Sequence, residues 1–299
     1  MKIGLQIPSF TWPGGPAALA PKLSEIATVA EDAGFHSIWV MDHFFQLDPM
    51  LGNADEPMLE SYSALTYLAA KTSRVKLGAL VTGVNYRQPA LLIKQVTNLD
   101  VLSGGRAYFG IGAAWYDREA HGLGFPFPAT KVRFEWLEET LQLAHQMWSG
   151  EVQPFNGKHF QLPEPICQPQ PVAQPHPPIL IGGMGEVKTL RFVAQYADAC
   201  NMFAGVGRDV LKRKLDVLQE HCQTVGRPYS AIEKTALTSA YLGVATAESN
   251  RTPGEIIDTC RTLADLGFSH VIFNMPVNVH EITPLEVFGR EIMPVVADF

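Results

Sequence analysis

The segment from Val75 to Gly112, VKLGALVTGVNYRQPALLIKQVTNLDVLSGGRAYFGIG, contains one complete strand–helix–strand unit. Its ends, Val75–Val81 and Arg106–Gly112, are short apolar runs without alternation, as is typical of parallel strands covered on both faces. Between them lie apolar residues at helical spacing: Leu92, Val96, Leu99 and Leu102. The segment therefore predicts two parallel strands joined by a helix.

The same alternation extends along the whole chain and predicts eight strands, each followed by a helix. The other predicted strands are Lys2–Ile7, Ser37–Met41, Ile179–Gly183, Ala199–Phe203, Thr235–Val244 and His270–Met275. Apolar residues at helical spacing around Leu23 and around Leu141 predict two more helices. The other predicted helices are Ser61–Lys71, Glu186–Tyr196, Asp209–Val225, Pro253–Leu266 and Pro284–Val296. Eight such units indicate an α/β fold of the (β/α)8 TIM barrel type. A doubly wound sheet is the weaker alternative, because no Gly-rich dinucleotide turn follows the first strand.

Three long loops account for the length beyond a plain barrel: Phe44–Glu60, Ala113–Thr130 and Ser149–Pro178. The last is rich in Pro and Gln and could be mistaken for a domain linker. A boundary there would leave two open half barrels, so we expect residues 1–299 to form a single barrel domain with insertion loops.

Composition narrows the class of protein. The 299 residues carry a formal net charge of −7, which argues against nucleic acid and acidic membrane surfaces as partners. No apolar run approaches the roughly 20 residues of a spanning helix. The four cysteines are far apart and form no metal-binding pattern with histidine. These observations predict a cytoplasmic, metal-free protein that acts on a small molecule.

Residues directly after the strands should line the mouth of a barrel, where TIM-barrel active sites lie. Asp42 and His43 follow the second strand, and this pair can bind a polar ring edge or exchange a proton. A loop cap and a structural histidine explain the same pair equally well. Thr82 and Asn85 follow the third strand, where ordinary turn chemistry is the simpler interpretation.

Two further strand ends carry candidate binding residues. Trp115 follows small residues after the fourth strand and could wall a pocket, although a packed loop is an equal alternative. After the fifth strand, Gly182, Gly183, Met184 and Gly185 precede a helix, so backbone N–H groups there suit a phosphate. That motif is weak alone, and its position between strand and helix strengthens it.

Taken in order, these motifs resemble the bacterial luciferase-like monooxygenase superfamily, and within it the branch that depends on the deazaflavin coenzyme F420. The matching stretches are Met41-Asp42-His43, Leu77–Thr82, Leu102–Arg106, Gly110–Trp115 and Ile179–Gly185. The resemblance runs along nearly the whole chain and rests on the ordered set of motifs.

This resemblance implies a deazaflavin or flavin ring across the barrel mouth. It also implies a distorted end of the third strand, often a non-proline cis peptide, near Leu80 and Val81. Asp42 and His43 would then border the ring and act as acid, base or polarising group. The remaining residues that the resemblance places against the cofactor are Leu80, Val81, Thr82, Asn85, Trp115, Gly182, Gly183, Met184 and Gly185.

The sequence also departs from the branch members that oxidise sugar phosphates. Those carry a Trp shortly after the Asp-His pair and a Glu just after the fourth strand, whereas this chain has Phe44-Phe45 and Trp115 there. We therefore expect a homodimeric enzyme that transfers a hydride between deazaflavin C5 and a small, largely apolar organic molecule. The alternatives are an FMN-dependent monooxygenase using O2, a non-redox phosphate-binding barrel enzyme, and a cofactor-binding protein without turnover.

Overall fold

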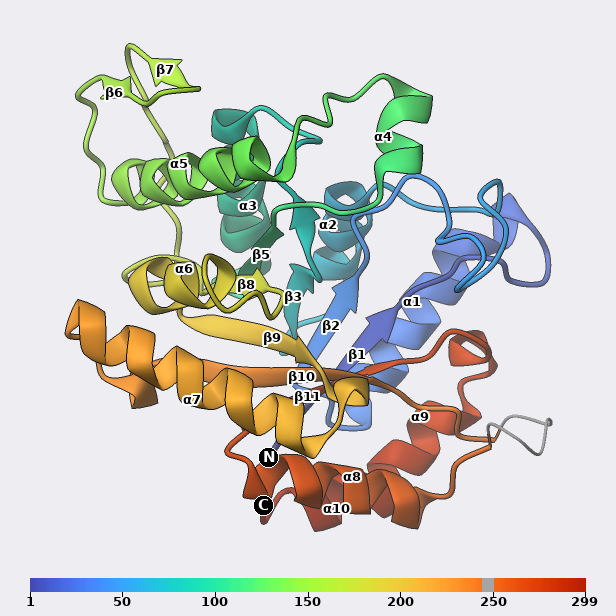
Figure 1. Ribbon diagram of the computed structural model, residues 1–299. Helices are drawn as coiled ribbons and strands as arrows, with labels where there is room; N and C mark the ends of the chain where they lie inside the picture. Colours follow the sequence, from blue (N-terminus) through green and yellow to red (C-terminus); the bar gives the residue numbers. More distant parts are fainter. Residues whose placement is uncertain (244–249) are drawn as a thin grey trace.

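Eight parallel strands form a closed barrel in the computed structural model, which describes residues 1–243 and 250–299 (Figure 1). The ring closes because β3 pairs with β2 on one side and with β5 on the other. The barrel strands are β1 (Lys2–Ile7), β2 (Ser37–Val40), β3 (Lys76–Ala79), β5 (Ala107–Gly112), β8 (Ile179–Gly182), β9 (Ala199–Phe203), β10 (Glu233–Ser239) and β11 (His270–Asn274). The predicted (β/α)8 barrel is confirmed.

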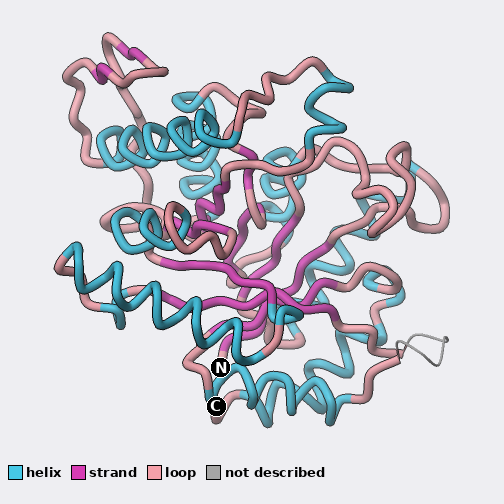
Figure 2. Tube along the Cα trace, in the orientation of Figure 1, coloured by secondary structure: helices cyan, strands magenta, loops and turns pink. Residues whose placement is uncertain are grey.

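Helices surround the strands, and the tube in Figure 2 shows them outside the central sheet. They are α1 (Pro16–Asp32), α2 (Ser61–Lys71), α3 (Pro89–Ser103), α4 (Asp117–Leu123), α5 (Thr130–Trp148), α6 (Thr189–Tyr196), α7 (Arg208–Val225), α8 (Pro253–Asp265), α9 (Thr283–Val287) and α10 (Met293–Val296). Local sequence sets their ends: Thr252 and Glu255 form a capping box before α8. None of the helices in the described ranges is long and apolar enough to span a bilayer.

Alternate residues of each strand face two different apolar layers. On β1, Ile3, Leu5 and Ile7 pack outward against the helices. The inner cluster fills the barrel itself and consists of Trp39, Leu80, Tyr108, Leu180, Ala199 and Ile272. The interior is therefore packed, as in other TIM barrels, whose active sites lie at the carboxyl ends of the strands.

A buried polar network occupies the amino end of the barrel. Oγ of Ser37 accepts from Nε1 of Trp39 at 2.7 Å and lies 2.9 Å from Nε2 of His270. Nδ1 of His270 lies 3.6 Å from Glu233, whose carboxylate also accepts from Lys2. This is the end of the barrel opposite the strand ends that carry the candidate site, so we assign the network to stability.

The structure corrects several predicted boundaries. The third strand stops at Ala79 and resumes as β4 (Thr82–Gly83), with a cis peptide between Leu80 and Val81 as the resemblance implied. The last predicted helix is divided, because a π-helical turn, Phe288–Ile292, separates α9 from α10. The strand predicted over Thr235–Val244 instead spans Glu233–Ser239 as β10, and Val244 itself lies outside the described residues.

The long loops contain structure of their own. The helix predicted from Glu186 begins at Thr189, which leaves a longer loop after β8. The loop Ala113–Thr130 contains α4, and the loop Ser149–Pro178 contains a short hairpin of β6 (Phe155–Asn156) and β7 (Gln161–Leu162). That residues 1–299 form one domain, and that the chain pairs into a homodimer, stay predictions.

Candidate active site

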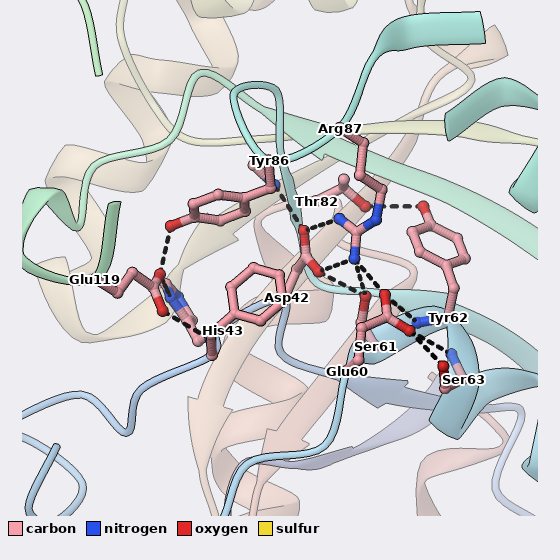
Figure 3. A network of polar contacts seen from close by, with 12 residues as sticks. Asp42, His43, Glu60, Ser61, Tyr62, Ser63, Thr82, Tyr86, Arg87 and Glu119 are labelled. Carbon is pink, nitrogen blue, oxygen red and sulfur yellow. Dashed lines mark hydrogen bonds and ion pairs between the residues drawn. The ribbon is translucent and has the colours of Figure 1, made fainter. Parts of the chain in front are cut away.

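Asp42 and Arg87 form a buried ion pair at the carboxyl end of the barrel (Figure 3). Nη1 and Nη2 of Arg87 donate to the two carboxylate oxygens of Asp42 at 2.8 and 2.9 Å. The same carboxylate accepts from Oγ of Ser61 at 2.6 Å and from the backbone N–H of Gly83 at 3.1 Å. Asp42 therefore fixes the start of α2 and the β4 turn to each other.

Arg87 also contacts Glu60, the residue that caps α2. Burial would lower the pKa of Arg87, but the charge of Asp42 and its hydrogen bonds outweigh burial and raise it. Only 7% of the Arg87 side chain is exposed, so its guanidinium is committed to these carboxylates. The resulting Asp42–Arg87–Glu60 clamp holds three loops of the barrel mouth together.

His43 points away from this clamp, toward Glu119 on α4 (Figure 3). Nδ1 of His43 lies 2.6 Å from Oε1 of Glu119, whose side chain is fully buried. Glu119 also accepts from the backbone N–H groups of Phe44 and Phe45 and from the hydroxyl of Tyr86. Burial raises the pKa of Glu119, but hydrogen bonds and the charge of His43 lower it overall, so the group is a carboxylate.

The tautomer of His43 follows from this arrangement. Because the carboxylate of Glu119 can only accept, Nδ1 of His43 carries the hydrogen. No hydrogen bond joins Nε2 of His43 to another residue in the ranges 1–243 and 250–299. The contact with Glu119 therefore fixes the orientation of the imidazole ring and leaves Nε2 without a protein partner in these ranges.

A glycine notch at the strand ends receives the side chain of Val81. A Cβ at Gly182 would lie 2.8 Å from Val81, and one at Gly112 would lie 3.0 Å from it. Gly110 is closer still to its neighbour, because a Cβ there would lie 2.0 Å from the carbonyl oxygen of Ala79. These absent side chains let β3, β5 and β8 converge under the mouth.

The loop between β8 and α6 presents backbone amides. Gly183 has a φ of +112°, and its N–H is already donated to the carbonyl oxygen of Asn201. The amides of residues 184–188 have no acceptor within the described part of the chain, and Lys188 lies in the same loop. The free donors therefore begin at Met184, two residues later than the motif alone suggested.

The other predicted cofactor residues lie around the mouth in different environments. The hydroxyl of Thr82 is buried and lies 2.9 Å from the hydroxyl of Tyr62. Nδ2 of Asn85 donates to Pro126, and its Oδ1 is buried without a donor among the described residues. Trp115 is 55% exposed, and its ring centroid lies 5.9 Å from that of His43. Leu80 belongs to the inner cluster.

Sequence reasoning missed Glu119 and Arg87 as partners of the predicted pair. Arg87 lies in the segment after the third strand that was interpreted as an ordinary turn, and Glu119 lies in the predicted loop Ala113–Thr130. A signal for Glu119 was present, because Gly124 ends a short polar stretch that follows Trp115-Tyr116 and forms α4. Within the described residues no cluster of histidine, cysteine and carboxylate side chains suits a metal ion.

The order of these motifs around the barrel agrees with a known family. The model of the luciferase-like monooxygenase family matches residues 1–252, most of the chain. The chain belongs to this luciferase-like family.

Curated relatives in the luciferase-like family include enzymes named for coenzyme F420. An F420-dependent glucose-6-phosphate dehydrogenase of Kineococcus radiotolerans is 33% identical over 216 residues, which are 72% of this chain. The matched part spans 62% of that relative's length. A 5,10-methylenetetrahydromethanopterin reductase of Archaeoglobus fulgidus is 24% identical, with 91% of this chain and 95% of the relative covered.

Solved structures of similar fold support the barrel assignment. The coenzyme F420 dependent tetrahydromethanopterin reductase from Methanopyrus kandleri superposes with a TM-score of 0.78 at 17% identity, covering 98% of both chains. An F420-dependent secondary alcohol dehydrogenase, solved with an F420-acetone adduct, gives a TM-score of 0.81 at 18% identity, also covering 98% of both chains. At these identities the likeness shows the luciferase-like fold alone.

Proposed function

We propose that this protein is an F420-dependent oxidoreductase that transfers a hydride between C5 of the deazaflavin ring and a small organic substrate. The observation that carries the proposal is the His43–Glu119 pair, which presents a free imidazole nitrogen at the barrel mouth. The names of the curated relatives support the choice of cofactor. When bound, the deazaflavin supplies a carbon centre that accepts or donates a hydride.

His43 is proposed as the acid/base residue. When an alcohol is oxidised, the hydride leaves the carbon and the hydroxyl proton must go to a base. Nε2 of His43 can take that proton, while Nδ1–H remains donated to Glu119. The carboxylate of Glu119 then stabilises the imidazolium, and in the reverse direction the same nitrogen returns the proton to a carbonyl oxygen.

Asp42 has a different proposed role from His43. Its carboxylate oxygens already accept from Arg87, Ser61 and Gly83, so it has no need of a further donor. We assign it as a positioning residue that holds the β4 turn, and with it Thr82 and Asn85, at the mouth. This replaces the expectation that Asp42 itself exchanges a proton.

The residues at the mouth fit a flat ring with a phosphate-bearing side chain. The amides of 184–188 supply donors for a phosphate. Lys188 adds a positive charge to the same loop, and its ammonium group lies 5.3 Å from the ring centroid of Phe134. The buried, unpaired Oδ1 of Asn85 is an acceptor that a ring N–H or a side-chain hydroxyl can satisfy. Glycines at 112 and 182 leave the floor beside Val81 without projecting side chains.

A side-by-side titration with oxidised deazaflavin and FMN, followed by ring fluorescence, tests the cofactor. We expect micromolar binding of the deazaflavin and much weaker binding of FMN. Preference for FMN would instead indicate an O2-using monooxygenase of the same fold. If neither ring binds, the proposed function is wrong and a non-redox barrel enzyme becomes the better hypothesis.

A further inference from the structure

The charge around His43 is negative. Asp42, Glu60 and Glu119 are carboxylates, and Arg87 is the guanidinium that pairs with the first two. Three carboxylates therefore lie around a single buried guanidinium. A dianionic group placed beside His43 would be repelled by this excess of carboxylate, and the burial of Asp42 and Glu119 strengthens the repulsion.

The other cations after the strands are engaged elsewhere. Arg118 pairs with Asp48, and Arg251 donates to the carbonyl oxygens of Ser239 and Glu255. Residues 244–249, which the structure does not describe, contain neither lysine nor arginine in the sequence.

Arg133 donates to the carbonyl oxygens of Ala113 and Pro128. Three cations remain after the strands in the described ranges, namely Lys131, which is exposed at the start of α5, Lys188 and Arg208. Lys188 lies in the amide-rich loop that we assign to the cofactor phosphate. Arg208 lines a separate cavity of about 260 Å³ between α7 and α8. The buried guanidinium groups after the strands, those of Arg87 and Arg133, therefore already donate to protein acceptors.

The inner wall of the mouth carries hydrogen-bond acceptors instead. Gln6 and Asn274 are opposite each other in the β1–β11 register, near the carboxyl ends of their strands. Oε1 of Gln6 and Oδ1 of Asn274 are both buried without a donor in the described ranges. Nε2 of Gln6 lies 3.5 Å from the carbonyl oxygen of Leu80, which orients the amide. Unpaired carbonyl oxygens repel anions and accept from O–H or N–H groups.

Aromatic side chains form the remaining wall near His43. The ring of Phe125 lies 5.1 Å from that of Phe44 and 5.3 Å from that of Tyr86, measured between centroids. The rings of Trp115 and Tyr116 lie 5.9 and 5.8 Å from the imidazole of His43, again between centroids. Such surfaces favour the apolar part of a neutral molecule.

We propose that the substrate is an uncharged organic molecule with a hydroxyl or N–H donor, and that phosphorylated sugars are rejected. The proposal rests on the proposed function for the identity of the site. It differs from the substrate in the names of the dehydrogenases similar to this chain. Gln6 and Asn274 are the residues that we assign to the substrate's donor group.

Calorimetric titration of the full chain tests the charge preference. The probes are glucose 6-phosphate, inorganic phosphate, glucose and cyclohexanol, each with and without saturating deazaflavin. With deazaflavin bound, we expect no measurable binding of the two phosphates and measurable binding of a neutral probe. Tight binding of glucose 6-phosphate to the loaded protein, or its rapid oxidation, would overturn the proposal, as would the failure of both neutral probes to bind.

Binding of the cofactor is measured in a separate experiment. Absence of deazaflavin binding in the fluorescence titration would contradict the proposed function. Without cofactor, tighter binding of glucose 6-phosphate than of inorganic phosphate would still count against the charge preference, because the β8–α6 loop alone should hold both through the phosphate. Phosphate bound without cofactor but displaced by deazaflavin marks the β8–α6 loop and agrees with the proposal.

Variants of the acceptor residues test the second half of the proposal. Gln6→Leu should weaken binding of the neutral probe by about tenfold, the cost of one buried hydrogen bond. Gln6→Glu keeps an acceptor at similar volume and should retain more binding than Gln6→Leu. Thermal unfolding of each variant checks that it is folded. Equal binding by wild type and a folded Gln6→Leu variant would contradict the assignment.

Discussion

Nδ1 of His43 and Oε1 of Glu119 are 2.6 Å apart, although 76 residues separate them in the chain. The short helix α4 makes this contact, because it returns over the second strand's loop and buries Glu119 behind His43 (Figure 3). A histidine that is oriented by a buried carboxylate and open at its other nitrogen is the arrangement of a general base.

Replacement of His43 should affect turnover much more than cofactor binding. In His43→Asn, the amide cannot take a proton, so we expect turnover of a neutral alcohol to fall about 100-fold or more. The dissociation constant of deazaflavin should not change. Both are measured on the same preparation, by steady-state reduction and by fluorescence titration; a variant with wild-type turnover would rule out the acid/base role.

Glu119 should act through His43. Glu119→Gln keeps the volume but removes the charge that stabilises an imidazolium, so turnover should fall at least tenfold, roughly the worth of a charged hydrogen bond. Tyr86→Phe is the matched control, because it removes one donor to the same carboxylate and leaves the charge. The pH dependence of turnover should change in Glu119→Gln and stay as in wild type in Tyr86→Phe. Identical pH profiles in both variants would indicate a purely structural glutamate.

The Asp42–Arg87 pair should be important for stability. In Asp42→Asn the buried guanidinium loses its main counter-charge, and breaking a buried pair typically costs about 3–5 kcal/mol of unfolding free energy. Glu60→Gln is the control at the exposed edge of the same clamp, where 33% of the side chain is accessible, and should cost about 1 kcal/mol. Denaturant unfolding of the two variants measures the difference; equal losses would contradict the central position of Asp42.

His36, at the amino end of the barrel, should make the free energy of unfolding depend on pH. Burial, helped by the charges of His270 and Lys2, lowers the pKa of His36 to about 4. The folded state therefore disfavours the protonated form, while the unfolded chain binds the proton near pH 6.5. The contribution to the free energy of unfolding is complete above pH 6.5 and is lost as the pH falls toward 4.

His36→Gln isolates this effect, since glutamine does not titrate. Unfolding free energies measured across this pH range should decline less steeply in the variant than in wild type. His121→Gln, at an exposed position on α4, is the control. A slope that is unchanged in His36→Gln and reduced in His121→Gln would contradict the assignment.

Gly110 should tolerate no side chain. A Cβ there would lie 2.0 Å from the carbonyl oxygen of Ala79. The backbone of Ala79 cannot move away without disturbing the pairing of β3 with β5 that closes the barrel. We expect Gly110→Ala to lower the free energy of unfolding by about 3 kcal/mol or more. Gly254→Ala, near the start of α8, has no neighbour closer than 3.9 Å and should be neutral or slightly stabilising. Equal stabilities of the two variants would show that the backbone where β3 and β5 meet can move to accept a methyl group.

The barrel was predictable from sequence because its signal repeats. Each strand is a short apolar run and each helix has an amphipathic period, so eight weak indications agree with one another. The break after Ala79 was not visible in composition, since Leu80 and Val81 continue the apolar run. Only the family resemblance pointed to the cis peptide that the structure has there.

The candidate site was predictable in part, for a physical reason. Residues that follow strands converge by topology, so His43, Thr82 and Gly183 could be placed at one end from sequence alone. Glu119 reaches the same place by the fold of a long loop, and no local pattern encodes that return. The partners of Asp42 were missed for the same reason, because a salt bridge depends on which loops meet.

The glycine notch around Val81 has a consequence for how this site can change. Volume at residues 81, 112 and 182 is shared, so an added methyl group at either glycine requires a smaller side chain at 81. In a library of variants selected for folded protein, single substitutions at these glycines would then be lost. Compensated pairs such as Gly182→Ala with Val81→Ala would be retained. The shape of the mouth floor should therefore evolve by exchange of volume between strands, in coupled steps.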